Sequence, residues 1–165
     1  MKRLLPLFCI LVVLFASAGV ASANSSQPDQ FTITGTTTSY DYRITPRDRT
    51  AFNATAAGTS SGYLTGSFTF KERGNVDLDP STFAGSGKGV NTGLLTIVKL
   101  NEPNTQVTIW FGGQVDYFAQ NPQEQVRGIW RVIEGKGAWK DLEGHGTYSG
   151  GVFDPFTVVF TGDFD

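Results

Sequence analysis

The sequence predicts an all-β protein folded as a single antiparallel closed barrel of about eight strands. Apolar and polar residues alternate with a period of two through most of residues 31–165, and Gly, Pro, Asn and Asp interrupt the alternation at close intervals. Almost no stretch has the periodicity of an amphipathic helix. Several of the 20 glycines lie inside these runs, where a small barrel needs kinks, whereas a β-sandwich, the alternative fold, would keep more of them in loops.

A long first strand is expected from residue 31 onward, with one irregularity. Phe31 and Ile33 share one parity, whereas Tyr40 and Tyr42 share the other. A strand keeps alternate residues on one face only while its pairing is regular, so the change of parity predicts a bulge or bend around Gly35.

The rest of the chain supplies the other strands and their turns. Pro46–Arg49 predicts the first turn, Lys71–Asn75 predicts a hairpin-like break before a short piece ending at Leu78, and Gly112-Gly113 predicts a bulge. The strand-like runs are residues 50–57, 64–70, 83–90, 94–100, 107–118, 126–134, 144–149 and 156–164.

Residues 1–23 have the pattern of a secretory signal peptide. A basic start precedes an apolar run that is too short to cross a bilayer comfortably, and Ala21-Ser22-Ala23 fits the small-residue cleavage pattern. We expect cleavage after this tripeptide, a flexible lead-in at residues 24–30 and the barrel domain at residues 31–165, with an uncleaved membrane anchor as the alternative. The mature protein is then expected to be secreted or periplasmic, without membrane attachment.

The composition argues against several classes of function. A formal net charge of −2, which becomes more negative once the basic signal is removed, argues against a nucleic-acid binder. The only cysteine, Cys9, lies within the predicted signal, so neither a disulfide nor a Cys-ligated metal is expected in the mature chain. A single histidine leaves few routes to a catalytic triad or a transition-metal centre, and we expect no metal and no cofactor.

Two ionisable residues are the candidates for acid–base catalysis. His145, the only histidine, lies near Glu143 and would serve as a general base if that carboxylate oriented it, but no nucleophile motif accompanies the pair. Glu134 lies near Arg131 and Lys136 at the same turn, and would act on a ligand if it were buried. The alternative for both is a position on the barrel rim, with His145 in solvent and Glu134 in an exposed ion pair.

Aromatic residues make up 13% of the chain, and the candidates for ligand contact are Trp110, Trp130 and Tyr117. Residues 94–100 and 129–133 are apolar on both faces. Because one face of a barrel strand normally meets solvent, the outer face of these strands is expected to be covered by a loop, a helix or another subunit. Two interpretations stay open: a packed interior with a homo-oligomer contact, or a hydrophobic pocket for a small apolar ligand.

The segment from Gly128 to Tyr148 carries a family resemblance. Its G-x-G-x-Trp-x-x-Leu-x-G-x-G run between two strands resembles the hairpin of the allene oxide cyclase and dirigent barrels, and of small secreted bacterial members of that superfamily, over residues 126–163. The resemblance implies a closed barrel with a lipophilic cavity. It assigns no catalytic residue to this chain, because one fold hosts unrelated activities.

Two functions from different classes follow. The first is non-catalytic binding of a small apolar ligand or a protein partner by an exported barrel. The second, implied by the resemblance, is an isomerase or cyclase that positions a reactive lipid in a dry cavity beside one carboxylate. They differ in one requirement, because only the enzyme needs an ionisable group inside the barrel. A barrel in which every Glu, Asp and His meets solvent would exclude the enzyme.

Overall fold

The structure is a computed structural model that describes residues 28–45, 49–79 and 81–165. The predicted signal at residues 1–23 and most of the predicted turn at Pro46–Arg49 lie outside this part of the chain.

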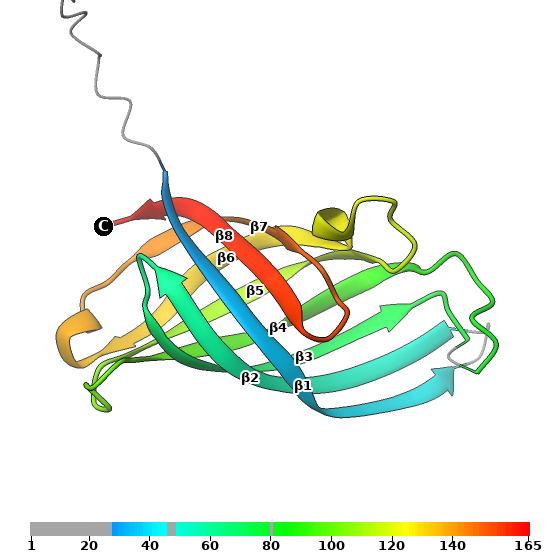
Figure 1. Ribbon diagram of the computed structural model, residues 1–165, viewed down its shortest axis with the longest axis horizontal. Helices are drawn as coiled ribbons and strands as arrows, with labels where there is room; N and C mark the ends of the chain where they lie inside the picture. The colour runs from blue at the N-terminus through cyan, green and yellow to red at the C-terminus, as the bar shows by residue number, and fades with distance from the viewer. Residues whose placement is uncertain (1–27, 46–48, 80) are drawn as a thin grey trace, which may run out of the picture.

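Eight strands pair antiparallel in sequence order, and the first also pairs with the last, so that the sheet closes on itself (Figure 1). The predicted closed barrel is confirmed. Two short 3₁₀ turns, Pro122–Glu124 and Gly137–Trp139, lie between strands. The strands are β1 (Asp29–Thr45), β2 (Arg49–Gly62), β3 (Gly66–Val76), β4 (Lys88–Lys99), β5 (Gln106–Asp116), β6 (Val126–Lys136), β7 (Gly144–Gly150) and β8 (Phe156–Phe164).

The expected break at Lys71–Asn75 is wrong, because β3 runs through it and pairs with β2 and β4 along its whole length. Lys71, Arg73 and Asn75 are exposed, which keeps their polar groups in water. Glu72 and Gly74 occupy the inward positions. Because one is charged and the other has no side chain, the alternation of apolar and polar residues that indicates a strand is absent from this part of the sequence.

The predicted irregularity in β1 is present, but it lies between Thr37 and Ser39 rather than at Gly35. Across this bulge the inward parity changes, so that Ile33 and Tyr40 both reach the barrel interior. The bulge expected at Gly112-Gly113 is wrong, because both glycines pair regularly with β4 and β6. In that pair of strands the register instead shifts between Thr108 and Ile109.

One end of the barrel is filled by its core. Trp130 is 2% exposed, and its Nε1 donates hydrogen bonds to the carbonyl oxygens of Thr147 and Thr161 at 3.0 and 3.3 Å. Its ring covers Gly162, where a Cβ would lie 2.7 Å from Cζ2, so the close approach requires glycine. The residues packed at this end include Phe31, Leu64, Ile97, Val107 and Trp130.

The outer face of β4 and β6 carries apolar side chains that the described chain leaves in solvent. Val90, Leu94, Ile129 and Ile133 are all exposed. The cover expected from the sequence is therefore not supplied by the described loops or 3₁₀ turns, and a homo-oligomer stays a prediction. Native mass spectrometry checks it: a mass above that of one chain is expected, and a strictly monomeric mass would contradict it.

Candidate ligand-binding cavity

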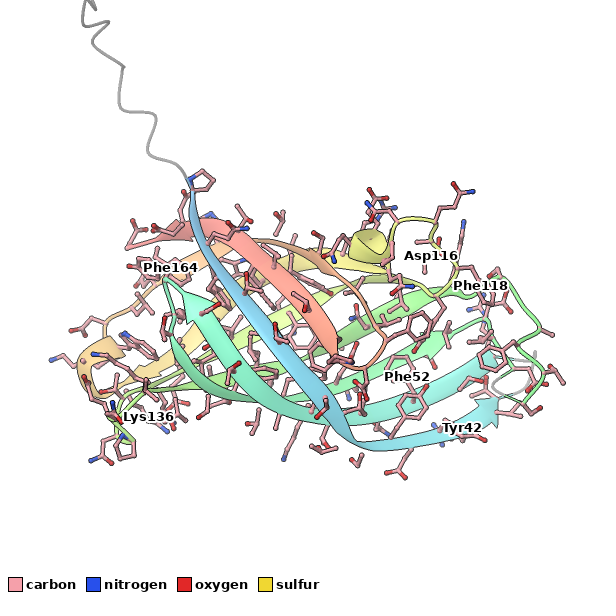
Figure 2. All side chains as sticks on the ribbon, viewed as in Figure 1. Tyr42, Phe52, Asp116, Phe118, Lys136 and Phe164 are labelled. Atoms are coloured by element: carbon pink, nitrogen blue, oxygen red, sulfur yellow. The ribbon has the colours of Figure 1, made fainter. Side chains whose placement is uncertain are left out.

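The other end of the barrel encloses a cavity of about 430 Å³. Residues of the β3–β4, β5–β6 and β7–β8 connections line it, and the first two of these connections lie toward the right of Figure 1. Figure 2 shows Phe52 and Phe118 toward this end and Lys136 and Phe164 toward the filled one. The apolar and aromatic side chains that form most of the wall include Ile33, Phe52, Ala54, Phe70, Leu95, Phe111, Phe156 and Val158.

Two polar side chains hold the loops around the cavity mouth. Gln125 is 5% exposed, and its Oε1 accepts a hydrogen bond from the Val152 N–H at 3.1 Å, which ties the β5–β6 loop to the β7–β8 loop. The carboxylate of Asp154 accepts hydrogen bonds from the N–H and the hydroxyl of Thr37, at 3.0 and 3.1 Å. Thr37 lies two residues beyond Gly35, where the pairing of β1 with β8 ends, so its N–H meets the β7–β8 loop instead of a β8 carbonyl.

A chain of polar groups crosses the cavity wall from β3 to β7. The amide Nδ2 of Asn91, on β4, donates to Oε1 of Glu72 at 2.7 Å. The hydroxyl of Tyr148, on β7, donates to Oδ1 of Asn91 at 3.0 Å. Asn91 is 6% exposed, so both of its polar atoms are used within the wall, and the Glu72 carboxyl is held in one place.

Burial dominates the ionisation of these groups. Desolvation raises the pKa of Glu72 above its ordinary value, and the hydrogen bond from Asn91 opposes this only in part. Desolvation also raises the pKa values of Tyr117 and Tyr148, and to a smaller degree that of Tyr40. The three phenols are therefore neutral at physiological pH, and burial favours the neutral form of the Glu72 carboxyl as well.

No basic side chain balances this carboxyl among the described residues. The cavity is lined by Glu72 and Asp154, and by no Lys, Arg or His of the described chain. The basic neighbours of Glu72 along β3, Lys71 and Arg73, are exposed on the outer face. The cavity is therefore apolar in most of its wall, and the side chains that could carry a charge at neutral pH, Glu72 and Asp154, are both acidic.

The aromatic candidates from the sequence are divided among three environments. Tyr117 lines the cavity. Trp130 is buried in the filled end and is not a lining residue. Trp110 lies on the outer face, where the guanidinium of Arg131 stands 5.5 Å from its ring centroid.

The two acid–base candidates lie outside the cavity. Glu134 is exposed and forms an ion pair with Lys136 at 3.2 Å. His145 is exposed on β7, opposite Arg131 and Asp163 in the strand register, and Glu143 is exposed too. Neither Glu134 nor His145 lines the cavity.

Sequence reasoning missed Glu72, Asn91, Tyr148 and Tyr40 as site residues. A signal for Glu72 exists, because it shares its parity with Phe68 and Phe70, whose side chains face the interior. A carboxylate on the apolar face of an alternating strand is a functional candidate, since burying a charge without a partner is costly.

A second hollow, of about 720 Å³, lies over β1 to β4 and is lined mostly by outward-facing polar residues such as Asp41, Arg43, Asn53 and Arg73. It lacks the apolar walls and the converging polar groups of the interior cavity, which is therefore the better candidate site.

Comparison of the chain with known protein families, curated proteins and solved structures gives no match. Within the described residues, no three His, Cys, Asp or Glu side chains gather as a metal site would require. No helix in the same part of the chain has the length and apolarity needed to span a membrane.

Proposed function

We propose that this protein binds a small, mainly apolar molecule in the open end of the barrel. The observation that carries the proposal is the cavity itself: about 430 Å³, walled by aromatic and aliphatic side chains, with a few polar groups converging at Glu72. Ligand sites commonly have this construction, in which apolar walls supply affinity and a few polar groups orient the ligand.

The cavity and its buried carboxyl both cost the fold stability. A protein that needed only stability would fill this volume with side chains, as its other end does around Trp130. It would also not place a carboxyl without a cationic partner on an apolar wall. Features that cost stability without a structural return are typical of sites kept for function.

Titration with the neutral fluorescent probe N-phenylnaphthylamine tests the proposal. We expect the wild-type protein to bind the probe with an emission increase and to melt at a higher temperature in its presence. Ala54→Phe places a ring in the cavity, because Ala54 is 8% exposed and lines it. This variant is expected to lose at least about tenfold in affinity, equivalent to ~1.4 kcal/mol.

Ala57→Phe is the matched control, because Ala57 lies on the same strand with the opposite parity and does not line the cavity. It is expected to bind the probe as the wild type does. Equal binding by the Ala54 and Ala57 variants, or no binding by the wild type, would contradict a ligand site inside the barrel.

A second candidate function, an isomerase or cyclase acting on a lipophilic substrate, is favoured by one observation. The carboxyl of Glu72 lines the cavity and has a raised pKa, which meets the requirement for an ionisable group inside the barrel. Wild-type protein is then expected to accelerate cyclisation of a lipid allene oxide, and Glu72→Gln to lose the acceleration. Equal rates for the two proteins would exclude this candidate.

We also propose that the protein acts after export. The basis is the basic start, short apolar run and small-residue tripeptide of residues 1–23. N-terminal sequencing of secreted or periplasmic material is expected to begin at Asn24. A start at Met1, or material retained in the membrane, would contradict export with cleavage.

A further inference from the structure

We propose that the cavity selects a cation: a small lipophilic amine whose ammonium group contacts the Glu72 carboxylate while its apolar body fills the space beneath the β7–β8 loop. This inference rests on the proposed binding function and names the ligand class for the same site. Three features of the described residues support it.

The first feature is the unused hydrogen-bonding capacity of Glu72. Its Oε1 accepts from Asn91, but no described residue donates to its Oε2. The described chain also has no buried side-chain oxygen or nitrogen that is sealed off without a partner, so Oε2 is accessible from the cavity. A carboxylate oxygen accepts hydrogen bonds only, and an ammonium group supplies both the donor and the missing positive charge.

The second feature is the set of aromatic rings around this carboxyl. Tyr40, Tyr117 and Tyr148 line the same cavity as Glu72, and the Tyr148 hydroxyl is joined to the Glu72 carboxyl through Asn91. Ring faces beside a carboxylate attract an organic cation, because the negative face of each ring adds to the field of the carboxylate.

The third feature is the charge of the side chains that line the cavity. Asp154 lines the cavity from the β7–β8 loop, and no Lys, Arg or His of the described chain lines the cavity. A ligand with a carboxylate or phosphate would meet two like charges and no basic partner, so an anion is disfavoured. A neutral alcohol of the same shape is the competitor, since it also has one donor for Oε2.

Isothermal titration calorimetry with two matched ligand pairs distinguishes a preference for an ammonium group from a preference for a neutral alcohol. The pairs are phenethylamine with phenethyl alcohol, and hexylamine with hexanol. At neutral pH the amine of at least one pair is expected to bind wild-type protein roughly tenfold to hundredfold more tightly than its alcohol, the range for a hydrogen bond between charged groups.

Glu72→Gln keeps the size of the side chain and an acceptor for Asn91, and it is expected to remove this preference. Glu134→Gln removes the same charge from an exposed ion pair and is expected to keep it. Binding of N-phenylnaphthylamine by each variant shows that its barrel is folded. Acidification is also expected to remove the preference, because Glu72 is protonated while the amine stays charged.

The outcomes distinguish the two proposals. If the probe binds but neither amine exceeds its alcohol, or if Glu72→Gln keeps the preference, the cation proposal is overturned and the apolar site stands. If the probe, the amines and the alcohols all fail to bind the wild-type protein, both proposals are overturned.

Discussion

Trp130→Ala is expected to lower the free energy of unfolding by about 3–5 kcal/mol, the range for removing a fully packed aromatic side chain. The indole is 2% exposed, and its loss removes contacts with the rings of Phe31, Phe160 and Phe164. It also removes the donor that two carbonyl oxygens share. Little can move into the space, because Gly162 has no side chain.

Chemical denaturation and thermal melting measure this effect, and the melting temperature is expected to fall by roughly 10 °C. Trp110→Ala is the control, because the same substitution on the outer face removes mainly the contact with Arg131 and is expected to cost about 1 kcal/mol. Equal losses for the two variants would contradict the assignment of Trp130 to the filled end of the barrel.

Glu72→Gln is expected to stabilise the protein at neutral pH, and the advantage is expected to vanish in acid. Burial raises the pKa of Glu72 in the folded state, so the folded protein holds a proton that the unfolded chain has already released. Between the ordinary pKa of a glutamate and the raised value, wild-type stability therefore falls as the pH rises. The glutamine side chain of the variant carries no charge at any pH and lacks this dependence.

Denaturation of both proteins across the acid and neutral range tests the expected direction of this pH dependence. The difference in unfolding free energy between variant and wild type is expected to grow as the pH rises from the ordinary pKa of a glutamate to the raised pKa, then to level off. Glu134→Gln, at an exposed ion pair, is expected to show no such growth. A difference that shrinks with rising pH would mean that the Glu72 carboxylate is stabilised in the fold rather than desolvated.

The barrel could be predicted from the sequence because the patterns that indicate its strands are local. Alternation of Phe156, Val158 and Phe160 with polar neighbours follows directly from the pleat of a strand, and internal glycines indicate coiled strands. β3 was harder to read, because Glu72 and Gly74 take inward positions without apolar side chains. The parity change in β1 was readable, but its position depends on pairing with β2, which periodicity along one strand does not contain.

The site could be predicted from the sequence only in part, for a physical reason. Parity tells whether an aromatic residue faces the interior, but not whether it lies at the filled or the hollow end of the barrel. Tyr117 and Trp130 were equivalent candidates in the sequence, yet Tyr117 lines the cavity and Trp130 packs the core. Asn91 donates to Glu72 and accepts from Tyr148, and these two hydrogen bonds join three strands of the closed barrel in a way that no local pattern encodes.

Carbon NMR titration of the Glu72 carboxyl, with and without N-phenylnaphthylamine, tests the central claim most directly. We predict a pKa above the ordinary value in the free protein, because the group lies in an apolar cavity. With the neutral probe bound we predict a further rise, because the probe displaces water from the same space. An ordinary pKa that the probe leaves unchanged would contradict the account of a carboxyl inside a ligand-binding barrel.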